Sequence, residues 1–380
     1  MEIIRQYPNI ASLERRTHRR IPRFVWDYFV GGVGPELCIA RNRDALDGVI
    51  LKPQYLCNAG SPDLSSSIAG QIFDLPFGVA PVGLGGLIWP RSAQILAGAA
   101  RRHNMPFALS AFSNVSLETI ADIAPEQSWF QHYVTNRPEI EKDLMDRLVS
   151  AGYRTILVTI DIPTAAKRDR DIKNGLSDPV SFNLRQLLQS IGKPRWALET
   201  AREGVPAFVN LARYCRKDAT LAELTAFFGS IIEGHVTPER LKVIRDAWPG
   251  KLVVKGVLHS ADAEECRRIG ADALVVSNHG GRQLDAAPAA TDVMAEVRSA
   301  AGREMSIIAD GGVRSGLDVA RMLACGADLV LLGRAFLFGV AALGPRGGDY
   351  VISILREELR TTMAQIGCNR VRDLPRFLGA

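Results

Sequence analysis

The chain has 380 residues, of which 47% are hydrophobic, and its 46 Lys and Arg against 41 Asp and Glu give a net charge of +5. This length permits a full core, either in one large barrel or in two ordinary domains. The charge is too weak and too dispersed for a nucleic-acid-binding protein, so we expect a small-molecule substrate and no nucleic-acid partner.

The cysteines and the apolar segments narrow the class further. The six cysteines are widely spaced and form no CxxC pair, which predicts neither a metal site nor a disulfide framework and favours the cytoplasm. No apolar stretch follows the arginine-rich N-terminus, and no run of about 18 apolar residues occurs. We therefore expect neither a secretory signal nor a membrane-spanning helix.

Taken in chain order, residues 1–75 come first, and we expect them to form helices and a short hairpin that act as an N-terminal cap. Eight short runs of β-branched or aliphatic residues follow and are predicted to be strands: 76–84, 106–112, 129–134, 155–161, 252–257, 273–278, 306–310 and 329–333. Segments with helical spacing, such as 92–103 and 140–151, separate them. Nearly continuous apolar strands are typical of a parallel sheet covered on both faces.

Eight strand-then-helix units predict an α/β fold, a (β/α)8 TIM barrel formed as a single domain over 1–380. A doubly wound nucleotide-binding fold is disfavoured, because Gly32-Val33-Gly34 lacks the third glycine at the required offset. The 73 residues 164–236, between the fourth and fifth strands, exceed an ordinary connection. We interpret them as a lid or a membrane-docking insertion.

The carboxyl ends of the strands carry the active site in such barrels. Polar residues are frequent there: Ser110, Gln131, Tyr133, Thr159, Asp161, Lys255, Ser277, Asn278, His279 and Asp310. Strand side chains alternate, so each of the pairs Gln131 with Tyr133 and Thr159 with Asp161 shares a face, whereas His132 turns toward the helices and is interpreted as structural. A purely structural barrel would place Val, Ile and Leu in these layers, so the convergence predicts a site.

Two glycine-rich strand ends predict a phosphate site. The seventh strand ends in DGGVR (310–314) and the eighth in LGR (332–334), where glycines let backbone N–H groups approach a ligand and arginines bind its oxygens. After the sixth strand, His279 lies three residues before Arg282. A general base and a bidentate carboxylate anchor therefore occur together.

The segment SNHGGRQLD (277–285), together with APVG (80–83), the Thr159 and Asp161 pair, VKG (254–256), DGGVR and LGRA (332–335), resembles the FMN-dependent 2-hydroxy acid dehydrogenase and oxidase family. GLGGLIWP (83–90) and KPRWALE (193–199) are most similar to its membrane-associated mandelate dehydrogenase branch, and flavin L-lactate dehydrogenases are also similar. The resemblance implies oxidation of a mandelate- or lactate-like L-2-hydroxy acid to the 2-keto acid.

The same resemblance implies roles for individual residues. His279 would be the base, Asp161 would stabilise its protonated form, Arg282 and Arg168 with Tyr28 would bind the substrate carboxylate, and Tyr133 would contact the substrate oxygen. The residues implied to bind FMN are Pro81, Val82, Gly83, Ser110, Gln131, Thr159, Lys255, Ser277, Asp310, Gly312, Arg314, Gly333 and Arg334. Removal of the C2 proton and removal of the hydroxyl proton with hydride transfer both fit these residues.

The resemblance also implies a homo-oligomer, a tetramer, and a quinone-type electron acceptor. We expect peripheral contact with the inner face of the cell membrane through 176–236, because seven basic residues and two acidic ones lie within 181–217 among apolar side chains. A soluble lid that packs on a neighbouring subunit is the alternative. Gly83 stands where oxidases tend to carry alanine, which favours a dehydrogenase over an oxidase that releases hydrogen peroxide.

Two other classes remain as alternatives. Lys255 could act as a Schiff-base amine in a barrel lyase, although this leaves the NHGGR segment without a role. A barrel kept only as a binding scaffold is disfavoured by the complete set of candidate catalytic residues.

Overall fold

A computed structural model describes residues 2–57, 60–176, 183–204, 207–216 and 219–379. Eight parallel strands close into a barrel in the order β10-β3-β4-β5-β6-β7-β8-β9. The strands are β3 (Phe77–Val79), β4 (Phe107–Ser110), β5 (Ser128–Tyr133), β6 (Thr155–Thr159), β7 (Lys251–Val257), β8 (Ala273–Val276), β9 (Ser306–Ala309) and β10 (Leu329–Leu332). All eight predicted strands are present and the predicted TIM barrel is confirmed.

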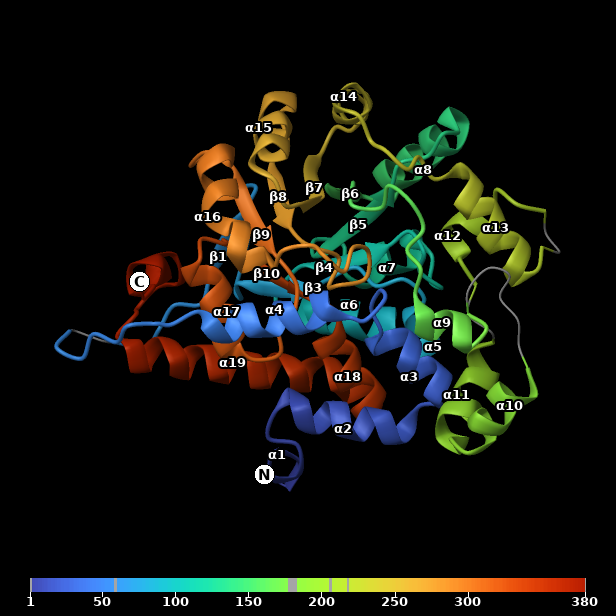
Figure 1. Cartoon of the computed structure of the whole chain (residues 1–380), viewed down its shortest axis with the longest axis horizontal. Coiled ribbons are helices and arrows are strands. Elements are labelled where there is room, and N and C mark those ends of the chain that lie inside the picture. Colours follow the sequence, from blue (N-terminus) through green and yellow to red (C-terminus); the bar gives the residue numbers. More distant parts are fainter. Residues whose placement is uncertain (1, 58–59, 177–182, 205–206, 217–218, 380) are drawn as a thin grey trace.

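Helices surround the barrel and precede it (Figure 1). The first four are α1 (Glu2–Gln6), α2 (Ile10–Arg20), α3 (Arg23–Val30) and α4 (Leu37–Gly48). The others outside 164–236 are α5 (Gly85–Ile88), α6 (Ser92–Arg102), α7 (Leu117–Ile123), α8 (Pro138–Ser150), α14 (Pro238–Ala247), α15 (Ser260–Ile269), α16 (Ala290–Ala301), α17 (Gly316–Ala324), α18 (Arg334–Leu343) and α19 (Gly347–Ile366), with the 3-10 helices η1 (Gly344–Arg346) and η2 (Val371–Phe377).

A hairpin of β1 (Ser66–Ile68) and β2 (Gln71–Phe73) lies at the amino end of the barrel. The ring of Phe73 packs edge-on against Trp129 at 6.0 Å between centroids. The Ser66 hydroxyl donates to the carbonyl of Asp328, just before β10. The hairpin therefore covers this end of the barrel.

The barrel interior changes from apolar to polar along its axis. Its lower layers are fully buried and include Ala108, Leu157, Val253, Ile308 and Leu331. Two residues further along, the same face carries a polar group in four of these five strands (Ser110, Thr159, Lys255 and Asp310) and Gly333 in the fifth. His132 points the other way, as predicted, and its Nε2 lies 3.3 Å from the Glu141 carboxylate of α8.

The described part of 164–236 contains five helices: α9 (Asp169–Lys173), α10 (Leu184–Ile191), α11 (Pro194–Glu203), α12 (Val209–Ala212) and α13 (Leu221–Ile231). They lie together on one side of the barrel (Figure 1). Across the described part of the chain, no helix combines the length and the apolarity needed to cross a membrane. Phe182 and Lys217, two of the residues expected at a membrane surface, lie outside the described residues.

Candidate active site

Polar side chains form a belt around the carboxyl end of the barrel. The Ser110 hydroxyl donates to Gln131 Oε1 at 3.0 Å, and Gln131 Nε2 donates to the Thr159 hydroxyl at 3.0 Å. Further round, Lys255 Nζ donates to the Ser277 hydroxyl at 3.0 Å. Neighbouring strands thus contribute linked donors and acceptors, which hold the belt in one arrangement.

Lys255 and Asp310 form a buried ion pair in this belt, with Nζ 3.4 Å from Oδ2. Burial lowers the pKa of Lys255, but the charges of Asp310 and Asp161 outweigh it and the pKa is raised. The lysine is therefore a cation, which argues against a Schiff-base nucleophile. The other carboxylate oxygen of Asp310 is buried without a hydrogen-bond partner, so it is available to a ligand hydroxyl.

His279 and Asp161 form a hydrogen-bonded imidazole–carboxylate pair in the site. His279 Nδ1 lies 3.0 and 3.1 Å from the two carboxylate oxygens of Asp161. Burial lowers the pKa of His279, and the charge of Asp161 opposes that shift. Burial raises the pKa of Asp161, but His279 and Lys255 outweigh it and the pKa is lowered. The carboxylate stays ionised and the imidazole is a neutral base whose Nε2 is free of this pair.

A strained turn presents the imidazole. His279, Gly280 and Gly281 all have positive φ, at 57°, 64° and 75°, and a non-glycine residue rarely adopts this region. The backbone N–H of His279 donates to the Ser277 hydroxyl, which also binds Lys255. A Cβ on Gly281 would lie 2.7 Å from the Ile39 side chain, so the two glycines permit a turn that the chain otherwise could not make.

Gly256, next to Lys255 in β7, leaves room for the Asp161 carboxylate. Its φ is +106°, and a Cβ there would lie 2.5 Å from Asp161 Cβ. We expect Gly256→Ala to displace Asp161 and to lower kcat by roughly tenfold to a hundredfold, since small misplacements of a catalytic pair are costly. Steady-state kinetics measure this.

The matched control is Gly270→Ala. Gly270 also has a positive φ, +86°, but a Cβ at this residue would meet no other atom within 4 Å. The substitution should lower the melting temperature and leave kcat unchanged. Equal kcat values for the two variants would contradict the role assigned to Gly256.

Arg282, Arg168 and Tyr28 form a corner beside His279, and the two arginines make it positively charged. We call it the cationic corner. Arg282 Nη1 donates to the carbonyls of Tyr28 and Gly31 at 2.8 and 2.7 Å, and its guanidinium lies 5.3 Å from the centre of the Tyr28 ring. Burial lowers the pKa of Arg282 to about 10, and the charge of Arg168 adds to the shift. Arg168 also lies 3.7 Å from the Asp171 carboxylate, which opposes part of this shift. Two guanidinium groups beside one carboxylate leave a net positive charge, which favours the binding of an anion.

A second cationic region lies at the ends of β9 and β10. Burial lowers the pKa of Arg314 to about 10, and it places the pKa of Arg334 well below its usual range, where Arg282 and Arg314 lower it further. Arg334 donates to the carbonyls of Phe29, Gly280 and Gly31. Neither guanidinium has a carboxylate partner among the described residues, so this region suits a doubly charged group such as a phosphate.

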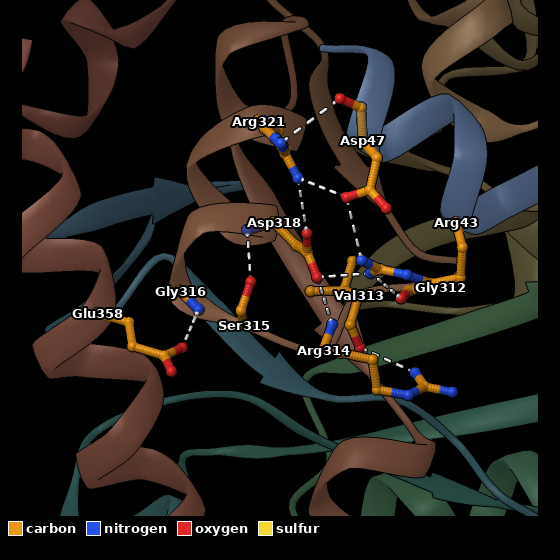
Figure 2. A network of polar contacts seen from close by, with 10 residues as sticks. All are labelled: Arg43, Asp47, Gly312, Val313, Arg314, Ser315, Gly316, Asp318, Arg321 and Glu358. Atoms are coloured by element: carbon orange, nitrogen blue, oxygen red, sulfur yellow. Dashed lines mark hydrogen bonds and ion pairs between the residues drawn. The ribbon is translucent and has the colours of Figure 1, made fainter. Parts of the chain in front are cut away.

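A partly buried ion pair between Arg43 and Asp318 supports the loop that carries Arg314 (Figure 2). The carboxylate of Asp318 accepts from the Arg314 backbone N–H at 2.8 Å and from Arg43 Nη1 at 2.6 Å. The same Arg43 nitrogen donates to the Gly312 carbonyl at 2.7 Å. Arg43 comes from α4 and Asp318 from α17, so two helices fix the backbone of 312–314 from behind.

A large apolar cavity adjoins the polar belt. Its volume is about 890 Å³, and Gly83, Tyr133 and His279 line both it and the space bounded by the belt. Aromatic rings form part of its wall: Phe112 lies 4.8 Å from Tyr133 and 5.3 Å from Phe208, between ring centroids. The cavity therefore offers an apolar compartment directly beside the imidazole.

The structure brings all the predicted site residues to this end of the barrel. Most line the two cavities, whereas Ser277 and Asp161 lie behind Lys255 and His279 as their partners. Sequence reasoning missed the Arg43 and Asp318 pair and the apolar wall. The residues of that wall that come from 164–236 include Trp196, Phe208 and Phe228. Among these residues, only Asp318 could have been suspected from the sequence, because it lies in SGLDV (315–319), directly after the glycine-rich loop.

The comparisons with known proteins agree with this geometry. The family model described as FMN-dependent dehydrogenase matches residues 17–378. The (S)-mandelate dehydrogenase of Pseudomonas putida is 36% identical over 96% of this chain and 92% of its own. An L-lactate dehydrogenase of Xanthobacter autotrophicus is 36% identical over 96% of this chain and 94% of its own. A solved structure described as monotopic membrane protein (S)-mandelate dehydrogenase superposes with a TM-score of 0.93, at 35% identity, over 98% of both chains.

Proposed function

This chain belongs to the FMN-dependent dehydrogenase family, and we propose that it oxidises an L-2-hydroxy acid with an aromatic side chain to the 2-keto acid and passes the electrons to a quinone-type acceptor. The observation that carries the substrate class is the apolar cavity of about 890 Å³ that opens directly beside His279. The names of the relatives, mandelate and lactate dehydrogenases, support the reaction type.

The cationic corner is the proposed anchor of the substrate carboxylate. Arg282 and Arg168 face the same region as Tyr28, and each guanidinium offers planar paired donors that match a carboxylate. With the carboxylate held there, the substrate side chain would extend into the apolar cavity. The Tyr133 hydroxyl, whose pKa is raised by burial, stays protonated and can donate to the substrate oxygen.

His279 is the proposed base, and Nε2 is the atom that accepts the proton. Its other ring nitrogen is held by Asp161 at 3.0 Å, so the carboxylate fixes the ring and stabilises the imidazolium that forms. Because the pKa of His279 is lowered by burial, the ring is neutral and ready to accept a proton near pH 7.

The belt fits the cofactor of the family. The unpartnered Asp310 oxygen suits a ribityl hydroxyl, the cationic region of Arg314 and Arg334 suits the phosphate, and Lys255 suits the electron-rich edge of a reduced flavin. The residues that would hold it are Pro81, Val82, Gly83, Ser110, Gln131, Thr159, Lys255, Ser277, Asp310, Gly312, Arg314, Gly333 and Arg334. When bound, FMN supplies the acceptor for the two electrons that leave the substrate.

The substrate class is tested by mixing the enzyme anaerobically with a panel of L-2-hydroxy acids and following the loss of flavin absorbance. We expect kcat/KM for L-mandelate to exceed that for L-lactate by roughly tenfold or more, the gain from burying an aromatic ring. The D-isomer is the control and should react far more slowly. A preference for lactate or glycolate would overturn the aromatic substrate and leave the reaction type intact.

Removal of the support behind the phosphate loop has a specific expected effect. In Arg43→Met the buried Asp318 loses its ion pair at 2.6 Å and keeps the one with Arg321 at 3.3 Å, while the Gly312 carbonyl loses a donor. We expect FMN to leave the holoenzyme roughly tenfold faster, while the release of riboflavin, which has no phosphate, changes little. Flavin fluorescence measures both rates.

Asp47→Asn serves as the control, because Asp47 is 59% exposed and contacts the network only from its outer side, at 3.3 Å from Arg43 and 2.8 Å from Arg321. It should release FMN at the wild-type rate. Equal acceleration of FMN and riboflavin release in Arg43→Met would indicate a general loss of structure rather than a role at the phosphate.

Helix α10 supports the proposed docking on a membrane. Its apolar residues face outward, with Leu184, Leu187, Leu188 and Ile191 between 57 and 69% exposed. Two of its polar residues face inward, where Gln186 donates to the Asn174 carbonyl and Gln189 accepts from the Phe24 N–H, whereas Arg185 is exposed. Such a helix suits the interface of a bilayer. The description of the solved relative as a monotopic membrane protein agrees with this.

The rest of the expected docking segment is only partly suited to this role. Trp196, Phe208 and Leu211 are buried and pack inward, so these residues, counted among the apolar side chains of the segment, belong to the protein interior. Arg213 and Arg216 are ion-paired with Asp143 and Glu223. The proposed contact is therefore confined to α10 and the turn that follows it.

The identity of the electron acceptor is tested by measuring how fast air and a soluble quinone reoxidise the reduced enzyme. Gly83 leaves little space, since a Cβ there would lie 3.2 Å from Phe112 Cβ, and the glycine is the feature that favours the dehydrogenase side by family resemblance. We expect slow reoxidation in air and a large rate gain with a soluble quinone. Rapid reoxidation in air with no gain from the quinone would overturn the acceptor.

A further inference from the structure

A cationic cleft lies between α2 and the turn that joins α10 to α11. Its volume is about 620 Å³, and the six cations that line it are Arg15, Arg16, Arg19, Arg20, Lys193 and Arg195. The cleft wall contains no carboxylate among the described residues. The active site does not use it, because none of the residues that line it borders the two catalytic cavities. The helices α2 and α11, which carry most of these residues, lie outside the barrel (Figure 1).

The surrounding protein neutralises the positive charges of the cleft only weakly. Arg16 and Arg20 both donate to one backbone carbonyl, that of Ala342 at the end of α18. Their guanidinium groups also stack on Tyr7 and Trp89, at 4.8 and 4.5 Å from the ring centres. These contacts fix the two arginines in place but supply no full negative charge.

Burial and mutual repulsion both act on the arginines of the cleft. Burial lowers the pKa of Arg20 to about 10, and the charges of Arg195 and Arg16 lower it further, against a smaller opposing effect of Glu199. The Nη2 atom of Arg20 is buried without a hydrogen-bond partner. No residue of the cleft forms an ion pair with a carboxylate of the described chain, so an anion that enters the cleft would meet several unpaired donors.

The position of the cleft indicates the source of that anion. Gly192, Lys193 and Pro194, which line it, directly follow the outward-facing apolar residues of α10. A bilayer that receives α10 would therefore bring its phosphate layer to the cleft. Lys193 Nζ donates to the Arg19 carbonyl at 2.8 Å, so the two walls are already tied together.

We propose that this cleft binds the phosphate of an anionic phospholipid and holds one headgroup between α2 and the α10–α11 turn. The proposal rests on the membrane docking proposed above, and it adds a discrete headgroup site to the apolar contact of α10. Arg19 and Arg195, one from each wall, supply exposed guanidinium groups that no protein carboxylate neutralises among the described residues.

The first experiment uses a lipid that does not form bilayers. The holoenzyme is titrated with monomeric dihexanoyl phosphatidylglycerol, and with dihexanoyl phosphatidylcholine as the neutral control, by calorimetry. We expect saturable binding of the anionic lipid, weakened roughly tenfold or more in the Arg19→Gln/Arg195→Gln double variant. If the double variant binds the anionic lipid as tightly as the wild type, or if the wild type does not bind it, the proposed site is wrong.

The matched control removes the same charge elsewhere. Arg267, on α15, and Arg303, after α16, are exposed and lie away from α2 (Figure 1). The Arg267→Gln/Arg303→Gln variant should bind as the wild type does. Equal weakening in both double variants would show diffuse electrostatic attraction instead of a site. If inorganic phosphate displaced the lipid at a similar concentration, the cleft would be a site for free anions, and the proposal that it binds a phospholipid would be wrong.

Sedimentation with vesicles separates this proposal from the docking itself. Wild type should bind vesicles that contain phosphatidylglycerol more tightly than vesicles of phosphatidylcholine alone, and the cleft variant should lose that difference. Leu188→Ser, at an exposed residue of α10, should weaken binding to both kinds of vesicle and leave titration with the short lipid unchanged. If wild type binds neither vesicle, docking fails while the titration still decides the cleft. If the cleft variant changes only the oligomeric state, the cleft is a subunit contact and the proposal is wrong.

Discussion

His279→Gln is expected to lose kcat by roughly 10² to 10⁴, the usual contribution of a general base. Glutamine cannot accept the proton that Nε2 takes, and it does not reproduce the paired contact with Asp161 at 3.0 and 3.1 Å. Flavin content should stay near that of the wild type, because most groups proposed to bind FMN lie on other strand ends. Ser277 shares the end of β8 with His279 but bonds its backbone N–H, which glutamine keeps. Stopped-flow reduction and the flavin absorbance of the purified variant measure the two quantities.

His259→Gln is the matched control. His259 caps α15 by accepting from the Ala261 N–H, so its loss should cost some stability and leave kcat within about twofold, as for sites remote from the chemistry. If His279→Gln kept more than about a tenth of the wild-type kcat, the assignment of the base would be wrong.

The pH profile provides an independent check on the same residue. Because the base must be neutral, kcat/KM should rise with pH through the pKa of free-enzyme His279 and then level off. Burial lowers that pKa, so the midpoint should lie below the roughly 6.5 of an unperturbed histidine. In Asp161→Asn the opposing carboxylate is absent, and the midpoint should move further toward low pH while the plateau falls.

Arg282→Lys is expected to raise KM and lower kcat, with kcat/KM reduced by roughly tenfold to a hundredfold, the effect of weakening charge-assisted hydrogen bonds. A lysine cannot keep the contacts to the Tyr28 and Gly31 carbonyls and still offer two parallel donors to a carboxylate. Steady-state kinetics with L-mandelate measure both parameters.

The decisive comparison is between mandelate and its amide. Wild type should strongly prefer the acid, and Arg282→Lys should narrow that preference because only the acid uses the paired donors. Arg202→Lys, at an exposed pair with Glu199, is the control and should behave as the wild type. Equal activity of wild type on the acid and the amide would exclude a carboxylate clamp.

The sequence by itself determined the barrel and the end at which the site lies. Strand side chains repeat every two residues and helical ones every 3.6, so local spacing encodes which face of each element is buried. The eight predicted strands are confirmed, and the inward face of Gln131 and the outward face of His132 followed from alternation alone. The NHGGR and DGGVR segments could also be interpreted from the sequence. Glycines next to a histidine or an arginine indicate a ligand site whatever the rest of the chain does.

Contacts between distant parts of the chain were decided only by the tertiary structure. Arg43 meets Asp318 across 275 residues, and neither position is distinctive before the barrel closes and brings α4 against α17. The aromatic wall and the outward apolar face of α10 depend in the same way on how 164–236 folds over the strand ends. Periodicity shows that a helix is amphipathic, but which face meets protein, and which meets solvent or a bilayer, depends on the surfaces that the rest of the chain places beside it.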